Sequence, residues 1–490
     1  MDGPLLVIDR DGAQPIGVQL VEGLRRGILT GALRPGDPVP STRALASELG
    51  VSRSAVVAAY EQLAGEGYLE MRQGAATRVA AIEHERAAAA TSPVAPTGLS
   101  SPAGRAIGST DAAAPPPSAD GTIRARLDLL PGRPSTARLD TRAWRAAWRH
   151  AASLVVPAMS PPSFGVPSLR AEIADHLRQA RGVACSADDV VVTAGTSEAA
   201  ALVASALRLV VGGTPVIAVE HPGYPLARRS LEQRGARTVP VAVDADGLVV
   251  ESLARMPHPL HAVMVTPSHQ YPIGGRLPVA ARLELLEWAR AADALVIEDD
   301  YDSEFRHLGA PLPALASLDH GEHVVLVGSF SKVLTPWLRI GYLVLPRSAR
   351  LREAIGDIRE NELCPVPGVA QEAVAALLAS GAVRRHIAVA RRDYAHRRRL
   401  VLHALDGIDR APLSALDGGL HAVVELASHA ASVAIVARLA AEEVAVAPLA
   451  DYSAVPGDER PGIVFGYASP SDTVLAEGLG RIREALLALA

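Results

Sequence analysis

The sequence predicts a multidomain protein in which a mostly α winged helix-turn-helix unit precedes a larger α/β domain with a mostly parallel sheet. Two short helical patterns joined by the turn LGVS predict the first unit. Apolar runs that alternate with helical stretches predict the second, because parallel strands are buried on both faces and need crossover helices. A stretch rich in Ala, Pro and Ser separates the two patterns, and a smaller C-terminal α+β part follows.

The composition limits the class of protein. The 490 residues are 49% hydrophobic, which permits large cores and excludes a wholly disordered chain. The net charge of −5 excludes a generally basic protein, so any nucleic-acid contact must come from a local patch. Cys185 and Cys364 are too few and too far apart for a disulfide framework or a metal site. The acidic start and the short apolar stretches, such as 201–211, predict a cytosolic protein without signal peptide or membrane contact.

Residues 1–82 are expected to form the winged helix-turn-helix. Apolar residues at spacings of four from Ile16 to Ile28 predict an amphipathic helix. Ser41 and Ser52 are suitable N-caps for two further short helices. The segment YLEMRQGAATRVA then alternates around a Gln-Gly tip, which predicts a β-wing.

A DNA-binding role for this unit is predicted from the positions of a few side chains. Residues 1–82 contain 8 arginines and 9 acidic residues, so the unit is not basic overall. The start of the second helix in such a motif enters the major groove, where arginine reads guanine edges or binds phosphate. The residues expected to bind double-stranded DNA are Arg43, Ser52, Arg53, Ser54, Gln73 and Gly74. For each residue alone, the alternative is a solvated helix cap.

The remaining chain divides into a linker and a long α/β region. Residues 83–123 lack hydrophobic periodicity and are expected to be a flexible linker. Residues 124–490 are expected to form one domain, with a large part over about 160–365 and a small part over about 366–490. The runs expected to be buried strands are 189–195, 215–220, 261–266, 294–300, 323–328 and 340–346.

Lys332 is the only lysine, so 47 of the 48 basic residues are arginine. Arginine replaces lysine as a surface charge, but it cannot replace a neutral amine that attacks a carbonyl to form a Schiff base. If only the number of lysines is considered, the alternative to a Schiff-base lysine is a surface lysine without a specific role. The sequence GSFSKVLTPWLRIGY places Lys332 after a predicted strand, between Ser329 and Arg339, whose side chains suit a phosphate.

Three other segments follow predicted strands and carry groups suited to a pyridine-aldehyde phosphate cofactor. The turn TAGTSEAA opens a helix, and its amides at Gly195, Thr196 and Ser197 are expected to bind phosphate. A carboxylate of VIEDDYDSEF is expected to pair with a pyridinium nitrogen, and Tyr224 of EHPGYP is expected to stack on the ring. Alone, each segment is more simply a helix cap, a solvated strand end or loop packing. Together around the single lysine, they predict a cofactor site.

These motifs resemble those of two known families. Residues from about 124 to 490 resemble a fold-type I aminotransferase. The order of winged helix, linker and this domain resembles the MocR/PdxR-type branch of the GntR-family regulators. The segments that carry the resemblance are LGVSRSAVVAAYEQLAGEGYLE, TPSHQYPIGG, EDDYDSEFR and GSFSKVLTPWLRIGY. The resemblance implies pyridoxal 5′-phosphate (PLP) as cofactor and a head-to-tail homodimer.

The resemblance also implies roles for single residues. Lys332 would form a Schiff base with PLP, and Asp299 would face the pyridine nitrogen. Tyr301 would contact the ring hydroxyl, and Tyr224 the ring face. The phosphate ligands would be Ser329, Arg339 and the turn 195–197, and His269 and Gln270 would lie near the ring.

Departures from the aminotransferase pattern leave two functions open. Tyr271-Pro272 stands where aminotransferases have Asn-Pro, and Ser160 stands where many have a tyrosine that reaches the partner subunit. No arginine lies near FGYAS, where aminotransferases bind the substrate α-carboxylate; Arg460 and Arg133 are the nearest candidates. The favoured function is a PLP-dependent transcriptional regulator that senses PLP, or an amine or amino acid bound to it. The alternative is an active aminotransferase with a DNA-binding appendage.

Overall fold

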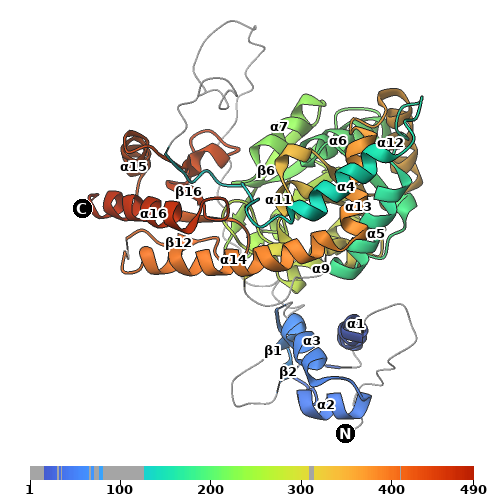
Figure 1. Ribbon diagram of the computed structural model, residues 1–490, viewed down its shortest axis with the longest axis horizontal. Helices are drawn as coiled ribbons and strands as arrows, with labels where there is room; N and C mark the ends of the chain where they lie inside the picture. Colours follow the sequence, from blue (N-terminus) through green and yellow to red (C-terminus); the bar gives the residue numbers. More distant parts are fainter. Residues whose placement is uncertain are drawn as a thin grey trace, which may run out of the picture.

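The computed structural model describes residues 16–29, 33–34, 36–65, 68–70, 77–80, 126–307, 314–408 and 410–489. Figure 1 shows a small helical unit, coloured blue, beside a larger body built from the rest of the chain. The stretch 83–123, which the sequence predicts to be a linker, lies outside the described residues, as do Gln73 and Gly74 at the predicted wing tip.

The small unit contains the predicted helices and wing strands. Ser41 caps the second helix by accepting a hydrogen bond from the amide of Ala44, and Gly50 ends that helix in the left-handed conformation. Leu24 and Tyr60 are fully buried in its core. The elements are α1 (Ile16–Leu29), α2 (Thr42–Leu49), α3 (Arg53–Gly65) and the antiparallel pair of β1 (Leu69–Glu70) with β2 (Arg78–Val79).

An eight-stranded, mostly parallel sheet forms the centre of the body, as the sequence predicts. Its order is β4 (Val190–Thr193), β11 (Gly341–Val344), β10 (Val324–Ser329), β9 (Leu295–Asp300), β8 (Ala262–Val265), β5 (Val216–His221), β6 (Arg237–Asp244) and β7 (Gly247–Leu248). Strands β6, β5, β8, β9 and β10 run parallel, whereas β11 is antiparallel to both of its neighbours and β7 is antiparallel to β6. The sequence analysis did not identify β6, whose residues are only partly buried and include Pro240.

Helices cover both faces of this sheet (Figure 1). One face packs against α6 (Thr196–Val211), α7 (Pro225–Gln233) and α12 (Ala349–Glu362). The other face packs against α8 (Glu251–Ala254), α9 (Val279–Ala292) and α10 (Leu315–Asp319). Because both faces are buried, the strands appear as continuous apolar runs in the sequence.

The C-terminal part is built on an antiparallel sheet of β12 (Leu413–Ser414), β13 (His421–Glu425), β16 (Gly462–Gly466) and β15 (Ala447–Pro448). It carries α15 (His429–Ala441) and α16 (Asp472–Leu487). The start of the body returns to this part, because β3 (Leu127–Asp128) pairs in parallel with β14 (Val444–Ala445).

Further helices complete the body among the described residues. They are α4 (Thr141–Ser153), α5 (Pro167–Arg181), α11 (Phe330–Val333), α13 (Gly368–Ala379) and α14 (Ala382–Ala404). Four short 3₁₀ helices are η1 (Ala187–Asp189), η2 (Ser303–Phe305), η3 (Pro336–Leu338) and η4 (Leu449–Tyr452). Within the described ranges, no single helix is long and apolar enough to cross a membrane; α13 and α14 pass that test only together, as a pair bent by 72°.

Candidate functional site

A cavity of about 290 Å³ opens at the carboxyl ends of the central parallel strands, the position where open α/β sheets bind ligands. The residues around it come from segments that are far apart in the chain. They are Pro131, Gly132, Gly195, Thr196, Ser197, Tyr224, Leu226, Thr266, Tyr271, Asp299, Tyr301, Ser329, Ser331, Lys332, Pro336 and Arg339. Of the residues that the sequence predicts to lie at the cofactor, His269 and Gln270 are missing from this set.

Lys332 lies on α11, directly after β10, and its amine is largely removed from solvent. Its Nζ donates a hydrogen bond to the carbonyl oxygen of Gly132 at 2.5 Å. Burial lowers the pKa of Lys332, while Asp302 and Asp299 oppose this shift. Gly132 has φ +78°, and a Cβ there would lie 3.1 Å from Nζ, so glycine leaves room for the amine. A lowered pKa increases the share of neutral amine, which is the nucleophilic form.

Asp299 lies near the end of β9 and is 3% exposed. Burial raises its pKa to about 8, with further contributions from Asp300, Glu220 and Asp302, and Lys332 acts in the opposite direction. Its Oδ1 is buried and has no hydrogen-bond partner among the described residues. A buried carboxyl oxygen without a donor is costly, and a cationic N–H placed in the cavity would relieve that cost.

The turn before α6 and the segment after β10 present anion-binding groups to the same cavity. Gly195 has φ +83°, and a Cβ there would lie 3.6 Å from Nη1 of Arg339. Arg339 itself has φ 52°, a conformation that non-glycine residues seldom adopt outside functional sites. Ser329 Oγ accepts a hydrogen bond from the Ser331 amide at 3.1 Å. Helix amides, hydroxyls and a guanidinium form a suitable set of phosphate ligands.

Tyrosine rings form another wall of the cavity. Tyr271 makes edge contacts with Tyr224 at 6.0 Å and with Tyr301 at 5.5 Å between ring centroids. The hydroxyl of Tyr301 lies 2.9 Å from Nδ1 of His269, which in turn lies 2.9 Å from Oδ2 of Asp302. His269 therefore stands behind Tyr301 and orients that hydroxyl, so it does not face the cavity.

A second buried carboxyl group, that of Glu220, holds the cavity-lining residue Thr266 in place. Glu220 accepts hydrogen bonds from the Thr266 amide at 3.0 Å and from the Thr266 hydroxyl at 2.5 Å. Gln270, also expected near the ring, donates to Glu220 at 3.2 Å and does not line the cavity. Burial raises the pKa of Glu220 to about 7, although these hydrogen bonds oppose the shift.

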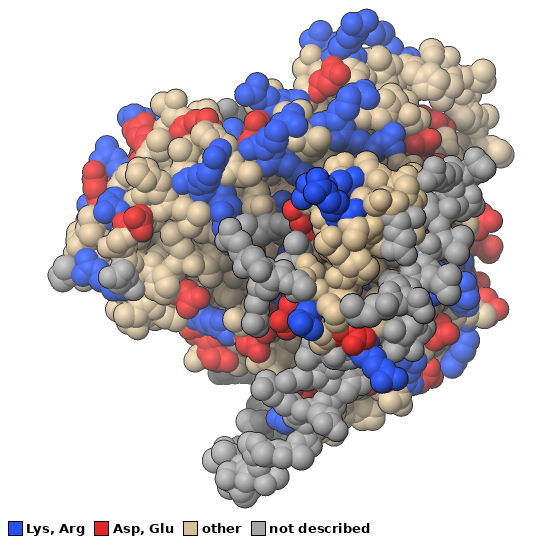
Figure 2. All heavy atoms as spheres, turned by 90° about the horizontal axis from the view of Figure 1, so that it is seen from below, with Lys and Arg blue, Asp and Glu red and all other residues tan. Residues whose placement is uncertain are grey.

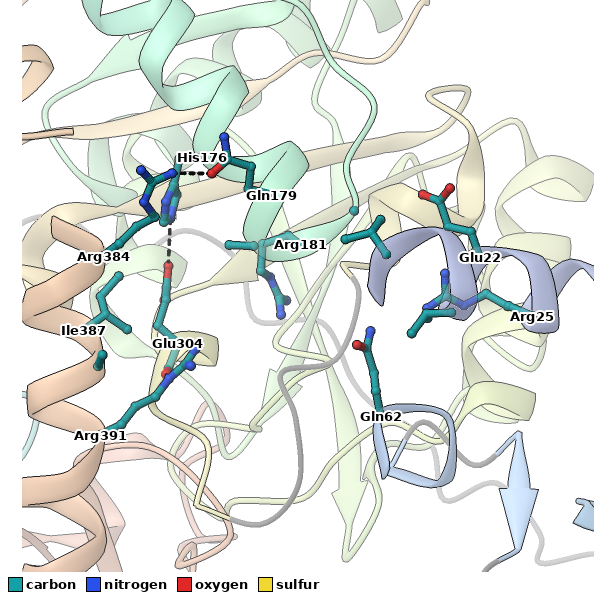
Figure 3. A pocket seen from close by; sticks show the side chains of 15 residues that line it. Glu22, Arg25, Gln62, His176, Gln179, Arg181, Glu304, Arg384, Ile387 and Arg391 are labelled. Atoms are coloured by element: carbon teal, nitrogen blue, oxygen red, sulfur yellow. Dashed lines mark hydrogen bonds and ion pairs between the residues drawn. The ribbon is translucent and has the colours of Figure 1, made fainter. Parts of the chain in front are cut away.

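Behind Asp299, a buried ion pair fixes the end of β9. Asp300 accepts a 2.8 Å hydrogen bond from Nε of Arg181, and Oε1 of Glu304 lies 3.5 Å from Nε2 of His176. Figure 3 shows Arg181, His176 and Glu304 beside a second cavity, of about 370 Å³, which lies between the small helical unit and the body. The strand that carries Asp299 is thus held by Arg181, a buried residue that also lines the cavity next to α1.

Neither arginine considered for a substrate carboxylate lines the first cavity. Arg460 donates to the carbonyl oxygen of Val243 at 2.8 Å, and Arg133 forms an exposed ion pair with Asp128. Among the described residues around the cavity, Arg339 is the only arginine. Because Arg339 is expected to bind the phosphate, no second arginine is left around the described cavity to bind a substrate carboxylate.

The predicted DNA-binding residues within the described ranges gather at the starts of two helices. Ser52 Oγ accepts a hydrogen bond from the Ala55 amide at 3.2 Å and lies 3.1 Å from Ser54 Oγ. Arg53, the first residue of α3, and Arg43, near the start of α2, are exposed. Both guanidinium groups are therefore accessible to a ligand.

Comparisons with known proteins agree with both halves of this arrangement. The family model described as aminotransferase class I and II matches residues 132–481, and that of the bacterial regulatory proteins of the gntR family matches residues 17–79. The chain is 41% identical over 476 residues to the HTH-type pyridoxine biosynthesis transcriptional regulator PdxR of Corynebacterium glutamicum, covering 96% of each chain. The chain belongs to the MocR-type regulators of the GntR family.

Further relatives agree with this assignment. The probable rhizopine catabolism regulatory protein MocR of Rhizobium meliloti is 34% identical, over 99% of this chain and 96% of its own. The crystal structure of the α-aminoadipate aminotransferase LysN of Thermus thermophilus matches with a TM-score of 0.67 and 26% identity, over 74% of this chain and 93% of that chain. The protein is therefore a transcriptional regulator with an aminotransferase-like domain, and a plain aminotransferase is the less supported interpretation.

The sequence analysis missed several residues around the cavity. Pro131 and Gly132 come from the segment after the predicted linker, whose return to the C-terminal part depends on the pairing of β3 with β14. Thr266 is the last residue of a predicted strand and follows directly on β8, so its position alone was a usable signal. Asp302 belongs to the quoted motif EDDYDSEFR, but its contact with His269 is visible only in the folded structure.

Proposed function

We propose that the aminotransferase-like domain binds PLP at Lys332 and that this binding controls the winged helix. The observation that carries the proposal is the joint placement of the only lysine and of Asp299, with its unpartnered buried oxygen, in one cavity. A protonated pyridine nitrogen is the cationic donor that Asp299 lacks. Arg339, Ser329 and the first amides of α6 fit the phosphate.

Bound PLP supplies an electrophilic carbonyl and an electron-withdrawing ring. The residues around the cavity would bind and orient the cofactor. Lys332 presents its neutral amine, and Asp299 keeps a proton on the ring nitrogen. Tyr301, oriented by His269, donates or accepts a hydrogen bond at the ring hydroxyl, and Tyr224 covers a ring face.

The absence of an assignable carboxylate clamp around the described cavity favours sensing over turnover. An aminotransferase must hold an α-carboxylate in a fixed position through both halves of its reaction, and a bidentate arginine provides that hold. Arg339 is the only arginine among the described residues around the cavity, and we assign it to the phosphate. PLP, or an amine bound to it, is then an effector that shifts the protein between two arrangements of its DNA-binding units.

We also infer that the protein acts as a head-to-tail homodimer. After α4, Val155, Val156 and Met159 are 91%, 87% and 84% exposed, and Trp337, beside the cavity, is 91% exposed. Contiguous exposed apolar side chains of this size are unfavourable in water and are characteristic of an interface. A dimer also provides two winged helices for two DNA half-sites.

The test is an absorbance titration of the purified protein with PLP, followed by a panel of amino acids and amines. Sensing predicts the absorbance band of lysine-bound PLP, and incomplete conversion to pyridoxamine phosphate with every amino acid. Complete conversion that a keto acid reverses would establish transamination and contradict the sensing role. Absence of the band would contradict the cofactor assignment.

A further inference from the structure

Helix α14 is the most basic element among the described residues. Its 23 residues, AVRRHIAVARRDYAHRRRLVLHA, contain seven arginines and one aspartate. The arginines repeat as adjacent pairs at intervals of seven residues, with an additional arginine before the third pair. The pairs are Arg384-Arg385, Arg391-Arg392 and Arg398-Arg399.

This repeat produces two lines of positive charge along one side of the helix. Residues seven apart lie two turns apart on nearly the same face, about 10.5 Å from each other. The other side of α14 is buried through Ile387, Tyr394 and Val401. The outer line, Arg385, Arg392 and Arg399, is exposed along its whole length.

Six of these seven positive charges have no ion-pair partner within the described part of the protein. Of the seven arginines, only Arg397 forms an ion pair among the described residues, with Asp472 at 3.0 Å. Arg384 and Arg398 donate to uncharged oxygens of Gln179 and Leu416, and Arg391 donates to a backbone oxygen. The aspartate of the helix, Asp393, is engaged by Arg138 from outside it. The exposed face of α14 thus has an uncompensated positive charge.

The same region of the molecule adjoins the winged helix. The cavity in Figure 3 has Glu22 and Arg25 of α1 on one side and Arg384 and Arg391 of α14 on the other. Figure 2 views the molecule from the side of the winged helix, and blue Lys and Arg side chains gather in the upper part of this face. The basic face of α14 therefore belongs to the side of the body that adjoins the winged helix.

We propose that α14 binds the phosphate backbone of the same DNA duplex that the winged helix recognises. The winged-helix region, residues 1–82, has 8 arginines against 9 acidic residues and so supplies little of the general attraction to DNA. Duplex DNA carries one charge per roughly 1.7 Å of its axis, so about 10.5 Å between arginines corresponds to about three base-pair steps. The exposed outer line matches an extended row of phosphates better than a single small anion.

The inference rests on the DNA-binding role of the winged helix and adds a second contact to it. It implies a specific division of labour: Arg53 and its neighbours select the operator, whereas α14 contributes affinity that is independent of sequence. Removal of α14 charges should therefore weaken binding to operator and unrelated DNA equally.

The experiment measures the affinity of the full-length, PLP-loaded protein for an unrelated duplex several helical turns long, at salt concentrations from about 50 to 200 mM. The test variant is Arg385→Gln/Arg392→Gln/Arg399→Gln. Three lost phosphate contacts should reduce the slope of log affinity against log salt by about 2 to 3 and weaken binding at least tenfold at low salt, on the order expected from counterion release.

Two further variants make the result specific. Arg229→Gln/Arg234→Gln/Arg237→Gln removes the same charge from α7 and the start of β6, at the opposite end of the body in Figure 1, and should leave the slope unchanged. Arg385→Lys/Arg392→Lys/Arg399→Lys keeps the charge of α14 and should keep the slope of the wild type.

Three results would overturn the proposal. They are an unchanged slope in the glutamine variant of α14, an equal loss in the α7 control, and a loss of binding in the lysine variant as large as that in the glutamine variant. A wild-type protein that binds neither operator nor unrelated duplex would instead refute DNA binding itself. These outcomes separate failure of the α14 contact from failure of the regulatory function.

Discussion

Replacement of Asp299 by asparagine tests the effect of this buried carboxyl group on two measurable quantities, the free energy of unfolding and the affinity for PLP. In the structure, the Asp299 carboxyl group is buried beside other carboxyl groups, and its Oδ1 has no donor among the described residues. The asparagine side chain has nearly the same volume and no charge to bury. Asp299→Asn should therefore stabilise the cofactor-free protein and weaken PLP binding.

The size of the first effect follows from the pKa of Asp299, which is raised from 3.8 to about 8. The folded protein keeps a proton that the unfolded chain releases between these two values. The stabilisation of the folded state by this retained proton is complete below the unfolded pKa. As the pH rises toward the folded pKa, the free energy of unfolding falls by about 1.36 kcal/mol per pH unit, and the stabilisation is lost once the pH has passed the folded pKa. Between pH 6 and 8 the wild-type protein should therefore lose about 2 kcal/mol relative to Asp299→Asn.

The second effect follows from the hydrogen bond that Asp299 offers to a cationic ring nitrogen. A hydrogen bond to a charged group contributes about 1.5–3 kcal/mol, so PLP should bind Asp299→Asn roughly tenfold to a hundredfold more weakly. Asp188→Asn is the control, because the Asp188 side chain is 96% exposed. Its stability and PLP affinity should equal those of the wild type.

The assays are denaturant unfolding of the cofactor-free protein at pH 6 and pH 8, and PLP titration by absorbance. Glu220 and Glu298, whose pKa values are raised to about 7, titrate in both proteins, so the difference between the variants reports the removal of Asp299 together with its coupling to Glu220. The same pH dependence in both proteins would refute the electrostatic reasoning. Unchanged PLP affinity would refute the placement of Asp299 at the ring nitrogen.

Three other predictions concern separate parts of the molecule. Lys332→Ala should abolish the absorbance band of lysine-bound PLP while circular dichroism remains unchanged; persistence of the band would contradict the assignment. Arg53→Ala should weaken operator binding at least about tenfold in a gel-shift assay without changing PLP loading, and equal operator affinity would count against α3 as the recognition helix. Val156→Glu/Met159→Glu places two charges on the exposed apolar segment and should convert a dimer into a monomer in sedimentation analysis; a dimer that persists would exclude this segment from the interface.

Much of the fold was predictable because its signals are local. The buried strands β4, β5, β8, β9, β10 and β11 appear as short apolar runs, since helices cover both faces of the sheet. Ser41, Ser52 and Gly50 mark helix ends through hydrogen bonds and backbone conformations that those residue types favour. Strand β6 was missed because its burial alternates irregularly and a proline interrupts it.

The sequence was sufficient to predict most residues of the candidate site, but not which of them face the cavity and which lie behind those residues. Lys332 and Asp299 follow apolar runs, and the carboxyl ends of parallel strands meet at one edge. By contrast, no local pattern shows that His269 stands behind Tyr301 or that Gly132 reaches the lysine from a distant segment. The arginine repeat of α14 is visible in the sequence, but the lack of carboxylate partners for six of its seven arginines among the described residues is evident only from the structure.

Control of the winged helix by PLP is tested most directly by the affinity of the protein for its operator with and without PLP, measured for the wild type and for Lys332→Ala. The operator is first selected from random duplexes with the wild-type protein. PLP is expected to change the operator affinity of the wild type severalfold and to leave that of Lys332→Ala unchanged. An equal PLP effect in both proteins, or no effect in a wild-type protein shown by absorbance to be loaded, would contradict this expectation.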